Sequence, residues 1–379
     1  MRLRELAAYS ARLPLATGAY EMSHGRRLTQ LETTVVRVTA DDGTTGYGEA
    51  CTLGASYIDG FAASVQAAVH ELAPTVLEGD AFGAETMLAR LDTAMRGHRP
   101  AKAAIDAALW DLRGRLLDLP VYQLLGGLQQ SSYRVFHPLT LASPTQMVDE
   151  AEMMAARGYR SWQLKLGNDP LDDAERVNTV LDALKGRTDF VTSDANRGWT
   201  MGQAFRFLAA IEGRDTYVEQ PCGTLEEVRQ VRTRSRHPIT ADEVIVEVPD
   251  MLRCIATAAA DAVNIKPARV GGLTRAAQIR DIAVAAGMMV MIDEPMGGDL
   301  ATAGIAHLSA SCRPDSFLAA SQVTETHITA ASGPPLALSG TPVVRDGLAH
   351  VSDAPGLGLE VNTEVLGEAL FTVRADRVS

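Results

Sequence analysis

The sequence predicts an α/β protein built around a closed (β/α)8 barrel, preceded by a smaller α+β segment. From Val135 onward, short apolar runs alternate with longer helical patterns, which is typical of a parallel sheet built from βαβ units. Five consecutive runs each end on or near a charged residue, 23 to 29 residues apart: Lys165, Asp194, Glu219, Asp242 and Lys266. Eight units of this length need roughly 200 residues, and the span 135–330 supplies them.

The first 125 residues indicate a mixed α+β segment. The stretch LETTVVRVTADDGTTGYGEA predicts two strands joined by a turn at Asp41-Asp42-Gly43. The stretch AKAAIDAALWDLRGRLLD predicts a long helix that packs against something, because one face carries apolar residues at helical spacing: Ile105, Ala108, Leu109, Leu112 and Leu116. Pro120 and the LLGG at 124–127 mark the end of this segment.

The barrel elements follow in chain order. Strands are expected in YRSWQLKL, DFVTS, TYVEQ, PITAD, AVNIK, MMVMID and SFLAA. Helices are expected at about 170–185 and 200–212. Because the strand ends of such a barrel converge on one face, the five charged residues are expected to meet there.

Composition excludes several classes of protein. The chain has 379 residues, 46% of them hydrophobic, with a formal net charge of −12, which argues against a nucleic-acid groove or an anionic membrane as partner. The N-terminus lacks the unbroken apolar run of a signal peptide, and no run is long enough for a membrane helix. Four widely spaced cysteines favour reduced thiols in a cytoplasmic protein: Cys51, Cys222, Cys254 and Cys312.

The three carboxylates predict a metal site. Asp194, Glu219 and Asp242 follow successive strands, and their charges repel each other unless a cation lies among them. A site made only of oxygen ligands favours a hard ion, and Mg²⁺ is the most available. The alternatives are three separate helix N-caps or rim salt bridges, since an acid after a βα strand often caps the next helix.

The two lysines predict acid–base chemistry. Lys165 and Lys266 fall on strands 2 and 6 of eight, so they face each other across the barrel. The reference pKa of lysine, about 10.4, is too high for a base at neutral pH, but Mg²⁺ and partial burial lower it. Such a pair suits removal of the proton α to a carboxylate, with Mg²⁺ stabilising the enediolate. The alternative is that each lysine forms a salt bridge with the acids.

The series of five charged residues at strand ends resembles that of the enolase superfamily, in the mandelate racemase/muconate lactonizing enzyme family. Within that family it is similar to the muconate-lactonizing-enzyme-like subgroup. The strings SDANRGW, VEQP, ADE and DAVNIKPARVGGLTRA are similar to that family's, as are GYGEACTLGASY and AAIDAALWDLRGRLLDLPVYQLLGG. The resemblance covers nearly the whole chain. It implies a modified (β/α)8 TIM barrel at 126–350 and an α+β capping domain formed by 1–125 and completed by 351–379.

The resemblance also implies roles for individual residues. Asp194, Glu219 and Asp242 would hold Mg²⁺, with Lys165 and Lys266 as the acid–base catalysts. The segments Tyr20 to Gly25 and Leu53 to Gly60 would close over a small carboxylate or amino-acid substrate. Relatives often assemble as dimers or octamers, so a homo-oligomer is expected.

One departure from the family and several further residues concern substrate binding. The usual Lys-x-Lys of the second barrel strand is Gln163-Leu164-Lys165 here, so Lys165 loses a neighbouring charge that would depress its pKa. Gln163 shares a face with Lys165 and is a candidate donor to the substrate carboxylate. The remaining candidates for substrate binding are Tyr57, Asn196, Asp293 and Glu294, of which the last two either bind a substrate ammonium or form an ordinary rim pair.

The reaction expected first is dehydration of a proline-type amino acid such as cis-3-hydroxy-L-proline. The strings QLKLG and EACTLGASY are similar to members acting on such substrates. The alternative is a racemase or epimerase, since both reactions need the same two lysines. A betaine substrate is less expected, because the eighth strand offers only Phe317 toward an aromatic cage. SQVT also lacks the Asp-x-Asp with which the family's dipeptide epimerases hold the substrate ammonium. A remote alternative is a non-catalytic barrel that binds a carboxylate.

Overall fold

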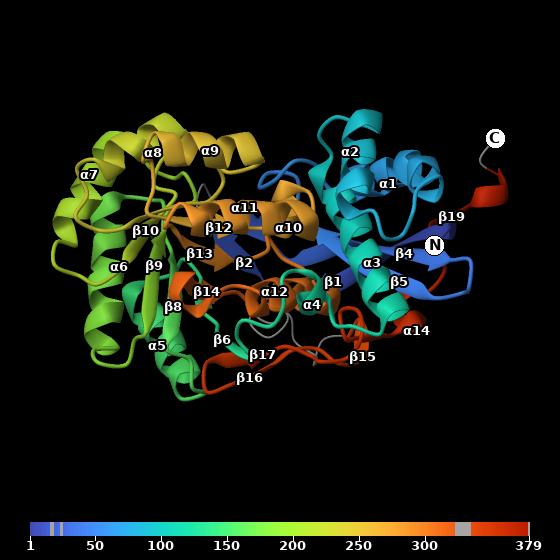
Figure 1. Ribbon diagram of the computed structural model, residues 1–379. Helices are drawn as coiled ribbons and strands as arrows, with labels where there is room; N and C mark the ends of the chain where they lie inside the picture. The colour runs from blue at the N-terminus through green and yellow to red at the C-terminus, as the bar shows by residue number, and fades with distance from the viewer. Residues whose placement is uncertain (16–18, 23–25, 323–334, 378–379) are drawn as a thin grey trace.

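The computed structural model describes residues 1–15, 19–22, 26–322 and 335–377. Its first unit, which we call the cap, is a four-stranded antiparallel sheet with three helices packed beside it (Figure 1). The strands, in sheet order, are β19 (Phe371–Arg374), β1 (Leu3–Pro14), β4 (Gln30–Ala40) and β5 (Thr45–Cys51). The helices are α1 (Ala62–Leu77), α2 (Ala84–Ala94) and α3 (Arg99–Leu117).

The cap confirms the predicted hairpin and the predicted long helix. Strands β4 and β5 pair in an antiparallel register that runs from Thr33 opposite Cys51 to Thr39 opposite Thr45. Helix α3 packs directly on β5. The backbones approach so closely that a Cβ atom added to Gly48 would lie 2.2 Å from the carbonyl oxygen of Ala104. The absence of a side chain at this strand position therefore sets how closely helix and sheet approach.

The second unit confirms the predicted barrel. Eight parallel strands follow in chain order, and a parallel bridge between Val135 and Ala320 joins the last strand to the residues before the first. The strands are β7 (His137–Leu139), β8 (Ser161–Lys165), β9 (Phe190–Asp194), β10 (Tyr217–Glu219), β11 (Ile239–Ala241), β12 (Ala262–Ile265), β13 (Met289–Ile292) and β14 (Phe317–Ala320).

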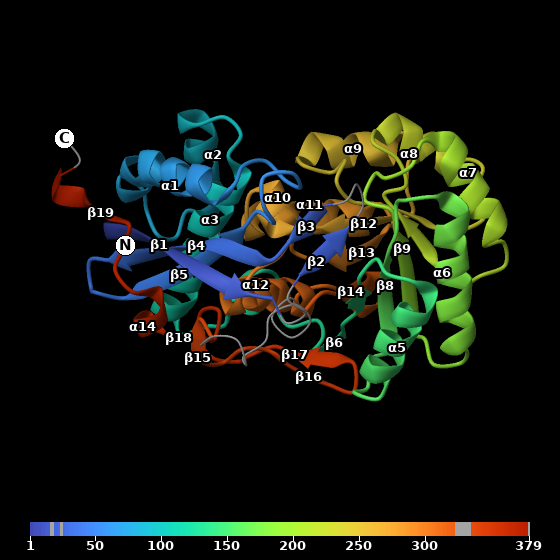
Figure 2. The same cartoon turned by 180° about the vertical axis from the view of Figure 1, so that it is seen from behind.

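Helices surround this sheet on the outside (Figures 1 and 2). They are α5 (Pro144–Ala155), α6 (Pro170–Ala183), α7 (Met201–Ala210), α8 (Leu225–Arg232), α9 (Val248–Ala256), α10 (Pro267–Val270), α11 (Leu273–Ala285), α12 (Asp299–Ala310) and the 3-10 turn η1 (Pro314–Ser316). The helices expected at 170–185 and 200–212 are α6 and α7. Phe136, Phe190 and Met291 belong to a separate small apolar cluster, contributed by barrel strands or their flanks.

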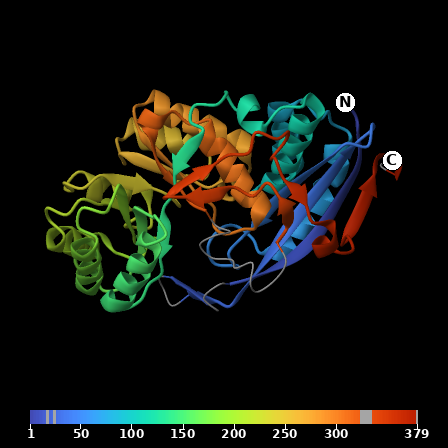
Figure 3. The same ribbon diagram turned by 90° about the horizontal axis from the view of Figure 1, so that it is seen from below.

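Shorter elements complete the described chain. They are the hairpin β2 (Tyr20–Met22) and β3 (Arg26–Leu28), α4 (Val121–Leu124), β6 (Ser132–Arg134), β15 (Ala337–Ser339), β16 (Val343–Arg345), β17 (Leu348–His350), β18 (Glu360–Val361), α14 (Thr363–Leu366) and the turn η2 (Ala375–Arg377). The hairpin extends from the cap toward the barrel (Figure 2). The C-terminal strand β19 lies along β1 (Figure 3). The boundaries at residues 125 and 350 stay predictions.

Buried carboxylates link the cap to the barrel. Glu49 on β5 accepts hydrogen bonds from the backbone N–H groups of Gly298 and Ala301, at 2.6 and 3.0 Å. Asp106 on α3 accepts from the backbone N–H and the hydroxyl of Thr274, at 2.9 and 2.6 Å. Because each carboxylate satisfies donors at the start of a barrel helix, these contacts fix the position of the cap over the strand ends.

Two expectations from composition can be compared with the structure. All four cysteines are free and buried, as expected for reduced thiols. No helix within the described ranges combines the length and the apolar character that crossing a membrane requires.

Candidate active site

The structure brings the five charged residues to the same ends of adjoining barrel strands. Lys165 lies opposite Asp194 in the β8–β9 register, and Asp194 lies opposite Glu219 in the β9–β10 register. Asp242 and Lys266 are the residues directly after β11 and β12. All five side chains are buried. Lys165 and Lys266 stand four strands apart, as the sequence predicts.

The carboxylates are not caps of the following helices. Helices α7 and α8 begin after Thr200 and Thr224, whose hydroxyls accept the capping hydrogen bonds, and α9 begins after Glu247. The alternative that the three acids are N-caps is therefore wrong.

The alternative of salt bridges does describe the contacts in the structure. Lys165 Nζ lies 2.7 Å from Asp194 Oδ2, and Lys266 Nζ lies 2.7 Å from Asp242 Oδ2. The guanidinium of Arg269 pairs with the other oxygen of Asp242. Buried charges need such partners, because an unpaired ion in a protein interior costs several kcal/mol.

Glu219 is held by neutral donors. Its carboxylate accepts from Gln163 Nε2 at 3.0 Å, Asn264 Nδ2 at 2.7 Å and Thr192 Oγ1 at 3.2 Å. Burial, together with the charges of Asp194 and Asp242, raises the pKa of Glu219 to about 8. The three acids thus feel one another's charge, which is the crowding that the sequence predicts.

The pKa of Lys266 moves opposite to the direction expected from the sequence. Burial acts to lower it, but the negative charges of Asp242 and Asp293 outweigh burial and raise the pKa well above the ordinary value. For Asp242 burial acts to raise the pKa, and the positive charges of Arg269 and Lys266 reverse the direction. A proton is therefore held firmly on Lys266 in this arrangement.

The donor set fits a hard divalent cation in its chemistry and placement. Three buried carboxylates at the ends of neighbouring strands supply only oxygen ligands, and a cation among them would relieve the crowding that raises the pKa of Glu219. In the described part of the chain, however, no three acidic, histidine or cysteine side chains converge so that they could hold a metal ion as they stand. The carboxylates point to lysine, arginine and amide groups instead, so the metal site stays a prediction.

Tyr57 brings the cap into the site. It lies in the segment after β5, and its hydroxyl accepts from Lys266 Nζ at 2.8 Å and lies 3.3 Å from Asp242 Oδ2. This contact places Tyr57 beside the charged strand ends, and the implied role of the segment Leu53 to Gly60 in closing over a substrate stays a prediction. Residues 23–25 of the other segment, and Val323 and Thr324 of SQVT, lie outside the described residues.

The remaining candidates differ in their contacts. Asp293 Oδ2 lies 3.2 Å from Lys266 Nζ, so Asp293 belongs to the charged cluster. Glu294 instead accepts from the backbone N–H of Ala268, at 3.0 Å. Asn196 Nδ2 donates to Glu243 Oε1 at 3.3 Å.

Sequence reasoning missed four residues of this site. Arg269 pairs with Asp242, Asn264 donates to Glu219, and Glu243 contacts Asn196. Gln220 accepts at its side-chain oxygen from the backbone N–H of Asp242, at 2.8 Å. All four lie within the strings VEQP, ADE and DAVNIKPARV. The one signal in the sequence that could have identified them is that each lies within a few residues of the end of a predicted barrel strand.

Three buried polar atoms of the site residues named above have no hydrogen-bond partner within the described chain, one of them Asn264 Oδ1 and the other two beside a cavity. The two beside the cavity are Asn196 Oδ1 and Glu243 Oε2. A cavity of about 290 Å³ adjoins them, lined in part by Tyr57, Arg197, Glu243 and Arg269. Unsatisfied buried polar atoms beside a cavity are typical of a ligand site.

Comparison with known proteins places the chain in a family. Residues 9–126 match the mandelate racemase/muconate lactonizing enzyme N-terminal domain, and residues 146–365 match the enolase C-terminal domain-like family. The chain is 37% identical over 368 residues to cis-3-hydroxy-L-proline dehydratase of Roseibium aggregatum, covering 97% of this chain and 98% of that protein. It is 27% identical over 382 residues to N-succinyl-L-Arg/Lys racemase of Bacillus cereus, covering 97% and 98%.

Similar solved structures support the same family assignment. A member of the enolase superfamily from Roseovarius nubinhibens, complexed with magnesium, superposes with a TM-score of 0.91 at 34% identity over 98% of this chain and 99% of that one. Dehydratases, racemases and cycloisomerases all occur among the relatives, so the alternative of a non-catalytic barrel is set aside. The chain is an enzyme of the enolase superfamily, in its mandelate racemase/muconate lactonizing enzyme family.

Proposed function

We propose that this enzyme dehydrates a 3-hydroxyproline-type amino acid, with cis-3-hydroxy-L-proline as the first candidate. The observation that carries the proposal is the pair of buried lysines, four strands apart, on either side of three buried carboxylates. The similarity over nearly the full chain to a cis-3-hydroxy-L-proline dehydratase supports the choice of substrate.

In the proposed reaction one lysine, in its neutral form, takes the α-proton. The electron pair of the broken C–H bond moves to the substrate carboxylate. As that pair returns to form the double bond between Cα and Cβ, the Cβ–O bond breaks. The hydroxyl leaves as water with a proton from a protonated lysine, so the net change is loss of one water molecule.

Asp194, Glu219 and Asp242 would hold Mg²⁺, with which two of the similar solved structures are complexed. Its double positive charge would stabilise the negative charge that develops on the substrate carboxylate. Lys165 and Lys266 must give up their pairing with Asp194 and Asp242 to act, and a cation on those carboxylates would compete for the same oxygens.

Substrate binding is proposed for five residues. Tyr57 lines the 290 Å³ cavity, and Asn196 carries one of the buried atoms that lack a hydrogen-bond partner. A cavity of this size suits a small cyclic amino acid. Asp293 is proposed to bind the substrate ammonium, since its carboxylate faces the charged cluster. Gln163 would donate a hydrogen bond to the substrate carboxylate if its amide turned away from Glu219. Glu294 has the weakest support as a substrate-binding residue, because its carboxylate accepts from the backbone of α10.

The second candidate is an epimerase that returns the proton on the opposite face. The racemase among the relatives and the two facing lysines favour it. Incubation of the Mg²⁺-loaded enzyme with cis-3-hydroxy-L-proline in deuterated water separates the two. A dehydratase gives an imine or keto product, and an epimerase gives α-deuterated starting material. If neither the product nor the deuterium appears, the proposed substrate is wrong.

Two wider expectations complete the proposal. We propose a homo-oligomer, which mass photometry would measure directly. The four free, buried thiols support a location in the cytoplasm.

A further inference from the structure

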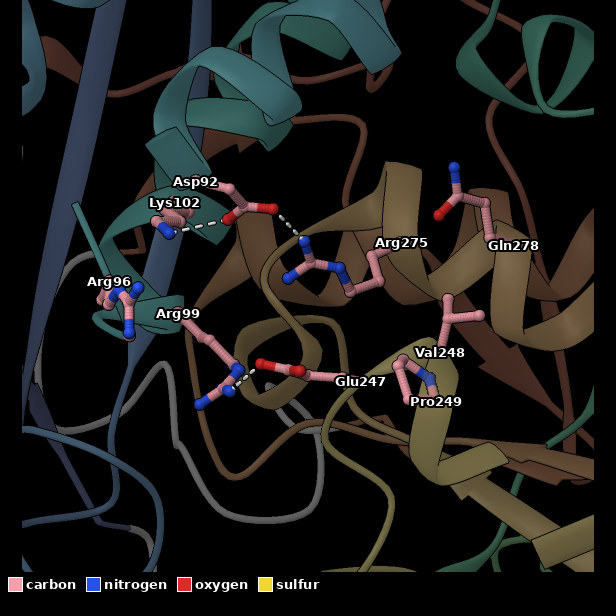
Figure 4. A pocket seen from close by; sticks show the side chains of 10 residues that line it. Asp92, Arg96, Arg99, Lys102, Glu247, Val248, Pro249, Arg275 and Gln278 are labelled. Carbon is pink, nitrogen blue, oxygen red and sulfur yellow. Dashed lines mark hydrogen bonds and ion pairs between the residues drawn. The ribbon is translucent and has the colours of Figure 1, made fainter. Parts of the chain in front are cut away.

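A second, larger cavity lies at the seam between cap and barrel, apart from the strand ends. Its volume is about 580 Å³. The residues around it come from the end of α2 and the start of α3 on the cap side, and from α9 and α11 on the barrel side (Figure 4). No part of the proposed reaction uses it.

The lining of this cavity is strongly basic. Four cationic side chains line it, against two carboxylates: Arg96, Arg99, Lys102 and Arg275, with Asp92 and Glu247. The chain as a whole carries a formal net charge of −12. The lining of this cavity therefore carries a charge of the opposite sign to the net charge of the molecule.

The carboxylates do not balance these cations. Asp92 accepts from Lys102 Nζ at 2.7 Å and from Arg275 at 2.5 Å, so one carboxylate serves two cations across the seam. Glu247 pairs with Arg99, which also binds Asp59 at 2.8 Å outside the cavity. Arg96 is exposed, and none of the ion pairs in the described part of the chain involves it (Figure 4). Arg96 is thus the one cation of this lining that stays outside its ion pairs.

The backbone adds to the positive potential. Helix α3 begins at Arg99 without a side-chain cap and without an acidic residue in its first turn. Three of the four cations lie within one turn of that helix start, although positive charges there are disfavoured by the helix dipole. A bound anion would neutralise both the side chains and the helix end.

We propose that this cavity binds a multivalent oxyanion of the phosphate class. Planar guanidinium groups form paired hydrogen bonds to phosphate oxygens. Three arginines line the space; Arg99 and Arg275 already donate to carboxylates, so Arg96 would supply the main paired contact. Lys102 gives two of its three N–H donors to Asp92 and Met95. Arg99 lines this cavity and also the 290 Å³ cavity proposed for the substrate, so the two cavities adjoin, but none of the residues proposed for acid–base chemistry or for metal binding lines the basic cavity.

The test is calorimetric titration of the full-length protein with inorganic phosphate, against sodium chloride at matched ionic strength. Wild-type protein is expected to bind one phosphate. Arg96→Gln is expected to weaken binding about tenfold, which corresponds to the loss of one charge-assisted contact of about 1.4 kcal/mol. Arg96→Lys should restore part of the affinity. Arg236→Gln, which removes an exposed charge elsewhere, should leave it unchanged.

Three results would overturn the proposal. One is the absence of binding heat with phosphate and with pyrophosphate. Another is equal weakening by Arg96→Gln and Arg236→Gln, which would indicate general screening. The third is binding that Arg96→Gln leaves intact, which would place the phosphate at another site. Because Arg96 is exposed, the variant is expected to fold, and its thermal unfolding without phosphate checks this.

Discussion

At the scale of single residues, the main feature of the site is that its buried charges form ion pairs and hydrogen bonds with one another. Lys266 contacts Asp242, Asp293 and the hydroxyl of Tyr57, while Lys165 contacts Asp194. Each contact offsets the cost of removing a charge from water. The two lysines therefore sit in different surroundings, and their roles as acid and base need not be equivalent.

Replacing either lysine should abolish the reaction. Lys165→Ala and Lys266→Ala are each expected to lower kcat at least about 100-fold, because a positioned acid or base contributes this much. The measurement is product formation and α-deuterium incorporation. Lys185→Ala is the matched control, since this lysine is exposed at the end of α6. Near-wild-type turnover by both active-site variants would remove the lysines from the mechanism.

His307 should make stability depend on pH. Burial lowers its pKa from 6.5 to about 4, and its Nδ1 accepts from the backbone N–H of Tyr122 at 3.1 Å. Above pH 6.5 the histidine is mainly neutral in both folded and unfolded states. Between 6.5 and 4 the unfolded state binds the proton more readily, so stability falls as the pH falls, by up to about 3 kcal/mol. Below 4 the loss levels off.

The check is the free energy of unfolding from urea titrations at pH 8, 6 and 4.5. His307→Asn keeps an acceptor for the Tyr122 N–H but has no titrating ring, so its stability should fall less with pH than the wild type's. Parallel curves for the two proteins would rule out His307 as the source.

At the scale of elements, close backbone approach and the strand-end loops position the site. Asn196, Arg197 and Gln220 have positive φ angles of 45°, 64° and 35°, directly after β9 and β10. Such left-handed conformations are unfavourable for side-chain-bearing residues and persist where the surrounding contacts require them. Here Arg197 N–H donates to the carbonyl oxygen of Gln220 at 2.9 Å, which joins the two loops.

Two glycines should respond oppositely to alanine. In Gly48→Ala the new Cβ would meet the α3 backbone at 2.2 Å, so unfolding free energy should fall by at least about 1–3 kcal/mol. Gly202 lies in helix α7, where an added Cβ would have no neighbouring atom within 4 Å, so Gly202→Ala should gain up to about 1 kcal/mol. Urea unfolding measures both. A neutral Gly48→Ala would show that α3 and β5 can separate at little cost.

At the scale of the whole molecule, the cap and the barrel together form the site. Tyr57 comes from the cap, whereas the residues it contacts come from the barrel. Glu49 and Asp106 fix the two units by accepting backbone hydrogen bonds at the starts of α12 and α11. Displacing the cap would therefore withdraw Tyr57 from Lys266.

Removing divalent cations should stop turnover without unfolding the chain. Chelator-treated enzyme is expected to be inactive, and added Mg²⁺ to restore activity. Because an ion bound only by the native state stabilises it, Mg²⁺ should also raise the Tm, and Asp194→Asn should reduce that rise. Full activity after exhaustive chelation, with no metal detected by mass spectrometry, would refute the proposed cation.

The sequence by itself determined the barrel, the hairpin, the long helix and the order of the five charged strand ends. These follow from local periodicity, because parallel βα units repeat at a nearly constant length and deliver their ends to one face. Only the tertiary structure decided which atoms meet there. Tyr57 lies 209 residues from Lys266, and β19 pairs with β1 from the other end of the chain. Contacts of this kind, like the basic cavity at the seam, depend on how distant elements pack, which no local pattern encodes.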